Sequence, residues 1–142
     1  MLVNMDMFGA AGNGGINEIV YPDVSTTYSG TAMLNMFDGD DSTWWIGNAI
    51  TSYVYLYNLS KQKISKINFR PGNYQGSDVN MTVTIKGSNT SISSDLVTIT
   101  SFNAKWSDGV KEIPINSDYK YYVIEIVGSS SAFGSCSRLF FS

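Results

Sequence analysis

The sequence has 142 residues, of which 43% are hydrophobic and 15% charged, with a net charge of −3 and an isoelectric point near 4.7. This length fits one domain with a sizeable core, and this composition argues against a disordered chain. The nine Lys and Arg residues are scattered, which argues against a nucleic-acid partner because phosphate binding needs clustered positive charge. The absence of histidine removes the commonest general base and the commonest zinc ligand.

The first segment, residues 1–15, is rich in Gly and Met and has no periodicity. We interpret it as a flexible or assembly-contact arm that precedes a single domain over residues 16–142. It lacks the basic region of a signal peptide, and no apolar run in the chain is long enough to cross a membrane. The single cysteine, Cys136, cannot form an intrachain disulfide and is expected to be a buried, inert thiol.

The rest of the chain alternates between short runs of β-forming residues and turn residues, which is typical of all-β proteins. A short helix, capped by Ser29, is expected over about 29–36. Apolar and polar residues alternate without a fault over 79–86, so one face of this strand should be buried. The expected strands cover residues 17–21, 52–59, 63–69, 79–86, 96–100, 110–115, 119–127 and 137–141. About eight short strands and one small helix predict an antiparallel β-sandwich.

Residues 37–45, between the expected helix and the next strand, read FDGDDSTWW. Gly39 permits a positive φ and the neighbouring aspartates can accept backbone hydrogen bonds, so a tight turn is expected. The same turn offers a hard cation the carboxylates of Asp38 and Asp40 and the oxygens of Thr43. From the residues alone, a metal-binding loop and a purely structural turn both remain open.

Two adjacent tryptophans, Trp44 and Trp45, end this stretch. Successive side chains of a strand point to opposite faces, so one indole should enter the core while the other faces outward or lies at a loop edge. An exposed indole offers a flat surface on which a sugar ring can stack. The alternative is that neighbouring loops cover both rings.

The run TAMLNMFDGDDSTWW, followed by YVYLYNL, ISKINFRPG, MTVTIKGSN and YKYYVIEIVGS, resembles the discoidin family. This family comprises the coagulation-factor C-type domains and the related galactose-binding carbohydrate modules. The resemblance spans roughly residues 17–141, and its matched positions are Ala32, Phe37, Asp38, Gly39, Asp40, Thr43 and Trp45. It implies a jelly-roll β-sandwich in which Trp45 is buried and Trp44 is free. It also implies a structural calcium ion held by Asp38, Asp40, Thr43 and a carbonyl near Asn35.

One departure from the family pattern concerns the last strand. Family members usually carry a Glu there that completes the calcium shell, whereas this chain has Ser137 or Arg138 at that place. A guanidinium can pair with a carboxylate in a two-pronged manner, so Arg138 is expected to pair with Asp38 or Asp40. Two hypotheses follow: a weakly held metal with a water in the vacant place, or an Arg138–Asp38 bridge that replaces the metal.

The resemblance also implies that ligands bind to loops at one end of the sandwich. A sugar site needs a stacking ring and a few fixed donors and acceptors. The candidate ligand-binding residues are Trp44, Arg70, Asn73, Tyr74, Trp106 and Phe133. Structural alternatives are that Tyr74 covers a turn, that Trp106 plugs the sandwich base and that Arg70 pairs with an acid.

These observations predict a protein that is not an enzyme, since the sequence has no Ser-centred elbow, phosphate loop or metal triad. The favoured function is a carbohydrate-binding, adhesin-type module for a galactose-type glycan or a bacterial surface polysaccharide. The alternative is a structural module of a viral tail or capsid, with homo-oligomeric or virion neighbours. The initial Met and the missing signal favour a particle assembled in the cytoplasm over an extracellular location within a larger protein. Phospholipid binding ranks third, because no basic residues surround the apolar loop tips.

Overall fold

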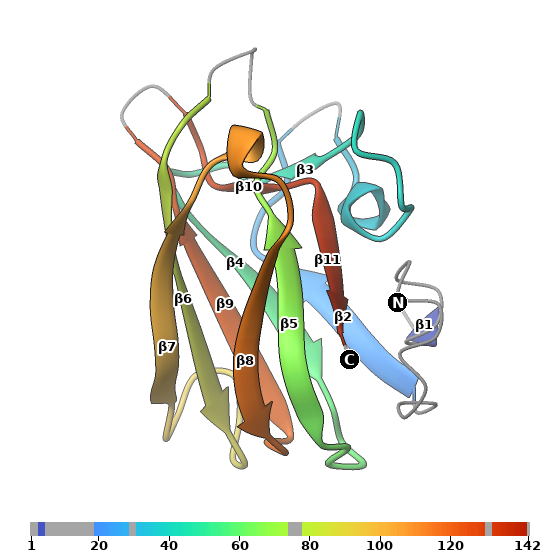
Figure 1. Ribbon diagram of the computed structural model, residues 1–142. Helices are drawn as coiled ribbons and strands as arrows, with labels where there is room; N and C mark the ends of the chain where they lie inside the picture. Colours follow the sequence, from blue (N-terminus) through green and yellow to red (C-terminus); the bar gives the residue numbers. More distant parts are fainter. Residues whose placement is uncertain (1–2, 5–18, 29–30, 74–77, 130–131, 142) are drawn as a thin grey trace.

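The computed structural model describes residues 3–4, 19–28, 31–73, 78–129 and 132–141. Short strands and two 3₁₀ helices make up its regular structure (Figure 1). In chain order these elements are β1 (Val3–Asn4), β2 (Ile19–Val24), η2 (Met33–Met36), β3 (Trp45–Ile46), β4 (Thr51–Tyr57), β5 (Ile64–Arg70), β6 (Met81–Ser88), β7 (Val97–Ala104), η4 (Trp106–Asp108), β8 (Lys111–Ser117), β9 (Tyr121–Val127), β10 (Ser135–Cys136) and β11 (Arg138–Phe141).

The strands form two packed layers. One layer is a six-stranded sheet with the order β1-β2-β4-β9-β6-β7, and the other contains the three-stranded sheet β11-β5-β8. In Figure 1, β8, β5 and β11 lie in front of β6, β9 and β4. A third, two-stranded sheet pairs β10 with β3 near one end of the sandwich. All the pairings are antiparallel, as the sequence predicted.

Period-two alternation explains how the six-stranded sheet presents one face to the core. On β4, Val54 and Leu56 are fully buried, whereas the alternating Tyr53, Tyr55 and Tyr57 are half-buried on the other face. On β6, Met81, Val83 and Ile85 are fully buried, in agreement with the alternation seen over 79–86. The densest β-forming run becomes β9, which lies between β4 and β6 as expected for a central strand.

The hydrophobic core fills the space between the two layers. Its largest fully buried side chains are Trp45, Tyr122, Phe69, Phe141 and Met36. They come from β3, β9, β5, β11 and η2, so segments far apart in the sequence meet in one cluster. Burial of this much aromatic and aliphatic surface supplies the main driving force for folding.

The prediction of an antiparallel jelly-roll sandwich is confirmed, and all eight expected strands are present with shifted ends. The two-turn helix over 29–36 is wrong in length and type: a single 3₁₀ turn, Met33–Met36, follows Ala32, which provides no side-chain cap. So short a segment gains too few hydrogen bonds to sustain an α-helix. Ser29 lies outside the described residues. Of the predicted arm, Val3–Asn4 pairs with Ile19–Val20 and the remainder also lies outside them.

Candidate functional site

Loops from both layers gather at one end of the sandwich, beside η4, β3 and β10 (Figure 1). We call this region the loop end; its described residues are 25–28, 44–50, 70–73, 105–110, 128–129 and 132–134. Backbone hydrogen bonds join its loops to one another. Gly47 N–H donates to Gly134 O at 2.9 Å, and Gly128 N–H donates to Ile50 O at 2.8 Å. These bonds fix the loops relative to one another before any ligand arrives.

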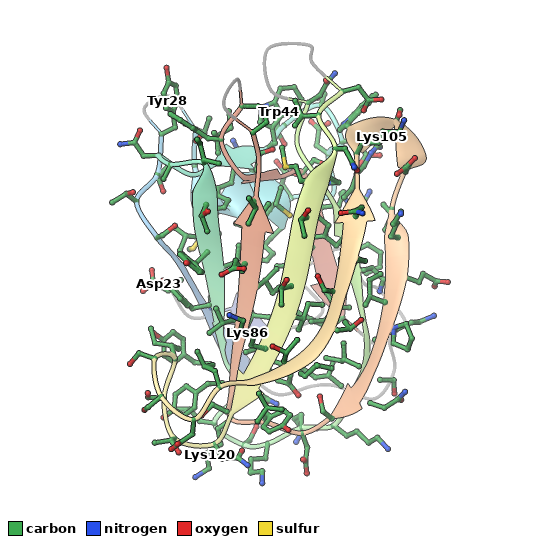
Figure 2. The ribbon with its side chains drawn as sticks, turned by 90° about the vertical axis from the view of Figure 1, so that its left-hand side faces the viewer. Asp23, Tyr28, Trp44, Lys86, Lys105 and Lys120 are labelled. Carbon is green, nitrogen blue, oxygen red and sulfur yellow. The ribbon has the colours of Figure 1, made fainter. Side chains whose placement is uncertain are left out.

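The two adjacent tryptophans occupy different environments, as the strand periodicity predicted. Trp45 is fully buried, and its indole Nε1–H donates to Thr27 Oγ1 at 3.0 Å. Trp44 is half-buried at the loop end, where Figure 2 shows it on the same end as Tyr28 and opposite Lys120. Trp44 is therefore the indole that remains partly accessible from solvent.

Trp44 lies against the backbone of Gly72, the second residue after β5. A Cβ atom at Gly72 would come within 2.9 Å of both Trp44 Cγ and Ser135 Oγ, so this position accommodates only glycine without a shift of its neighbours. Ser135 Oγ also accepts a hydrogen bond from Gly72 N–H at 3.1 Å. Gly72 thus lets the loop approach closely enough to support the indole.

Arg70 and Trp106 form a second aromatic contact at the loop end. Arg70, the last residue of β5, places its guanidinium carbon 4.0 Å from the centroid of the Trp106 ring. Its Nε–H donates to the Trp106 carbonyl at 2.9 Å, and its Nη1 lies 3.1 Å from Asp41 Oδ2. The predicted alternative that Arg70 pairs with an acid is therefore observed. Trp106, in η4, is half-buried.

The 3₁₀ turn that carries Trp106 is held by Asp78. The Asp78 carboxylate accepts hydrogen bonds from the backbone N–H and the hydroxyl of Ser107. These hydrogen bonds, the hydroxyl first, lower the pKa of Asp78 because they favour its charged form. Within the described residues, Trp106 Nε1 is the buried side-chain polar atom without a hydrogen-bond partner.

Phe133 packs against Tyr28, a residue that sequence reasoning missed. Their ring centroids are 5.9 Å apart at an interplanar angle of 62°, an edge-to-face contact. Tyr28 is 37% exposed, which makes it one of the most accessible large apolar side chains in the described chain. The sequence marks Tyr28 only as an aromatic residue within a run of turn-forming residues. Asn73 is half-buried beside Gly72, and Tyr74 lies outside the described residues.

The four residues predicted to hold calcium lie together around the Thr43 hydroxyl. Thr43 Oγ1 is 2.6 Å from Asp38 Oδ2 and 3.1 Å from the carbonyl oxygen of Asp40. It is also 3.5 Å from the carbonyl oxygen of Asn35. Calcium takes six to eight oxygen ligands, so these oxygens provide only part of a shell. In the described part of the chain, no three His, Cys, Asp or Glu side chains gather as a metal site.

Arg138 was predicted to pair with Asp38 or Asp40, and this choice of carboxylate is wrong. Arg138 Nη1 lies 3.1 Å from Asp41 Oδ1 instead. Asp38 is already engaged within the turn, because Oδ1 accepts from Asp40 N–H at 2.8 Å and Oδ2 accepts from the Thr43 hydroxyl. Among the described residues, no helix is long and apolar enough to span a bilayer.

No known family model matches the sequence, and no curated protein matches it. Several solved structures share its fold. The family 32 carbohydrate-binding module of AlyQ, in complex with 4,5-unsaturated mannuronic acid, is 18% identical with a TM-score of 0.70, and the match covers 86% of this chain and 93% of the module. The family 32 module of C. perfringens NanJ, in complex with galactose, is 14% identical with a TM-score of 0.68, over 99% and 98% of the two chains. A pectin-binding module is 21% identical with a TM-score of 0.67, over 88% and 91%.

These matches extend over most of each chain, so they describe the sandwich as a whole and not one shared motif. They agree with the discoidin-type resemblance drawn from residues 32–45 and from the order of the strands. The chain therefore has the galactose-binding-like, discoidin-like β-sandwich fold that is found in family 32 carbohydrate-binding modules.

Proposed function

We propose that this chain is a non-catalytic carbohydrate-binding module that attaches its owner to a glycan through the loop end. One observation carries this proposal: partly accessible aromatic rings and fixed polar groups share one end of a fold that carbohydrate-binding modules use. The aromatic groups are Trp44, Trp106 and the Tyr28–Phe133 pair. The sequence lacks histidine, which also supports a binding function over catalysis.

The arrangement suits sugar recognition for a physical reason. The C–H face of a pyranose ring is apolar and stacks on an indole or phenol ring, while its hydroxyls need hydrogen-bond partners nearby. Trp44 supplies such a ring, and Asn73 lies on the segment that supports it. Because backbone hydrogen bonds already order the loops, binding would cost little conformational entropy.

The proposed ligand class is a galactose-type glycan or a bacterial surface polysaccharide. One neighbouring module is in complex with galactose, another is in complex with 4,5-unsaturated mannuronic acid, and a third binds pectin. The shared fold therefore accommodates several sugars. Specificity in such a fold is set by the loops, which differ from module to module. The choice of sugar in this chain therefore depends on the residues around Trp44 and Phe133.

A glycan array followed by titration calorimetry tests the proposal. We expect binding to at least one galactose-type or polysaccharide probe, with quenching or a shift of tryptophan fluorescence. Trp44→Ala should weaken that binding by about tenfold, or about 1.4 kcal/mol, since it removes the stacking contact and the apolar area that the sugar covers. Leu59→Ala is the matched control: Leu59 is 54% exposed in the turn between β4 and β5, at the opposite end of the sandwich. A blank array together with unchanged fluorescence would contradict the proposal.

A further inference from the structure

Two arginine side chains hold one carboxylate of the turn formed by residues 38–43. Asp41 Oδ2 lies 3.1 Å from Arg70 Nη1, and Asp41 Oδ1 lies 3.1 Å from Arg138 Nη1. We name these three residues the arginine clamp. The side chains of Arg70 and Arg138 are only 13% and 19% exposed, whereas that of Asp41 is 44% exposed. Because both cations are largely shielded, solvent screens these pairs less than it screens surface pairs.

The strand register brings two arginine side chains close together, and this favours a carboxylate between them. Arg70 ends β5, Arg138 begins β11, and the two are direct partners in the antiparallel register of these strands. Directly opposed residues lie about 5 Å apart, where two like charges repel one another. Asp41 places a negative charge between them, although it is 97 positions from Arg138 in the sequence. The turn is therefore bound to both strands by one shared anion.

The other two carboxylates of the turn, those of Asp38 and Asp40, also accept hydrogen bonds from donors of the protein. Asp38 accepts from Asp40 N–H and from the Thr43 hydroxyl. Asp40 Oδ1 accepts from the backbone N–H of Ser42 at 2.9 Å and from its hydroxyl at 2.6 Å. These N–H and O–H donors hold the turn in its present shape.

The donor set around Thr43 also falls short of a calcium site. The Thr43 hydroxyl, one carboxylate oxygen of Asp38 and the carbonyl oxygens of Asn35 and Asp40 make a cluster of four oxygens, whereas calcium takes six to eight. The charged side chain that reaches this turn from the last strand is Arg138, a cation. Its positive charge opposes a divalent ion nearby and attracts the carboxylate of Asp41.

The clamp also reaches the proposed sugar site. Arg70 stacks 4.0 Å over the ring of Trp106 and donates to its carbonyl oxygen, so any movement of Arg70 changes the support of Trp106. We propose that the arginine clamp fixes the 38–43 turn in place of a bound calcium ion, and that Asp41 acts through Arg70 to position Trp106. The metal independence and the positioning of Trp106 do not depend on the proposed function. Only an effect of this positioning on sugar affinity would rest on the proposed function.

Thermal melts of the wild-type protein test the first half of the proposal. We expect the melting temperature to be the same in EDTA, in millimolar magnesium and in millimolar calcium, within about 1 °C, because little stability is gained from an incomplete shell. A rise of several degrees that is specific to calcium would overturn the proposal. This measurement needs no variant, so it does not depend on the folding of a mutant.

Variants of the last strand test the ionic role directly. Arg138→Met should lower the melting temperature by about 5 °C in EDTA and in calcium alike, because it leaves part of the Asp41 charge unpaired. Arg138→Lys retains a positive charge and should lose less. Lys66→Met is the matched control, since it removes the exposed Lys66–Glu112 pair and should leave the midpoint unchanged. Equal losses in the Met and Lys variants, or no loss in either, would overturn the clamp.

Tryptophan fluorescence and near-ultraviolet circular dichroism test the positioning of Trp106. Asp41→Asn should change the signal of Trp106, which is obtained as the difference between each protein and its Trp106→Phe counterpart. Lys66→Met should leave this signal unchanged. An unaltered Trp106 signal in Asp41→Asn would overturn the positioning role. A blank glycan array would contradict the proposed function but would leave the melts and the spectra as independent tests.

Discussion

At the scale of single residues, the chain uses its tryptophans in opposite ways. Trp45 is removed from solvent entirely and satisfies its one polar atom with Thr27, which is the condition for burying an indole without penalty. Trp44, one residue earlier, lies on Gly72 and keeps part of its surface accessible. Strand periodicity predicted such a division, although β3 begins only at Trp45 and Trp44 lies in the loop before it.

The partner of Arg138 shows why other residue-level features escaped prediction. The sequence indicated that a carboxylate of the turn would pair with Arg138, but it indicated Asp38 or Asp40 and not Asp41. The choice depends on which carboxylate the turn leaves without internal donors, and this follows only from its folded geometry. Tyr28 was missed for a similar reason, since its contact with Phe133 spans most of the chain.

The hydrogen bonds from Ser107 predict a pH effect at Asp78. They lower the pKa of Asp78 below its ordinary value of 3.8, so they stabilise the folded protein above pH 3.8, and this stabilisation is lost as the pH falls through the lowered pKa. Ser107→Ala should raise the pKa of Asp78 toward its ordinary value. A carboxyl NMR titration measures this change, with Ser101→Ala as a control whose hydroxyl pairs with Thr84 instead. An unchanged pKa in Ser107→Ala would contradict the assignment.

At the scale of secondary-structure elements, alternation was the reliable signal. The strands with clear alternation, 79–86 among them, were located to within a few residues because a sheet with one buried face requires that pattern. The two-residue strands β3 and β10 were not predicted. Two residues are too few to show a period. These strands are defined by their antiparallel pairing with each other, which joins segments far apart in the sequence.

Gly87 on β6 gives a prediction about the packing of the central strands. A Cβ atom there would lie 2.3 Å from the ring of Tyr119, close to the root of a side chain that cannot simply rotate away. Gly87→Ala should therefore lower the free energy of unfolding by about 1–3 kcal/mol, the usual cost of overpacking. Urea unfolding measures the loss. Thr82→Ala, on the exposed face of the same strand, should cost less than about 0.5 kcal/mol, and equal losses would contradict this explanation.

At the scale of the whole molecule, the fold was predicted well because its determinants are distributed along the chain. Turn residues recur between short strands, and the match of residues 32–45 to a known pattern fixed the topology that alternation alone leaves open. The site was predicted less completely. Trp44, Arg70, Trp106 and Phe133 do lie at the loop end, but which of them contact one another depends on loop paths that no local pattern encodes.

Cys136 reports on the cooperativity of the entire sandwich. Its thiol is fully buried between the layers, and burial raises its pKa far above the ordinary value. A thiol reagent such as DTNB should therefore react with the native protein only through unfolding, at a rate that rises with urea in step with global opening. The urea-unfolded protein is the control and should react at once. Rapid reaction in the absence of urea would contradict the burial of this residue.

The hydrogen bonds between Gly47, Gly134, Gly128 and Ile50 have a kinetic consequence for recognition. A partner would meet a surface that already has its final shape, so encounters would not have to wait for a rearrangement. Chemically related partners would then associate at similar speeds, and the length of time each one stays attached would decide which is retained.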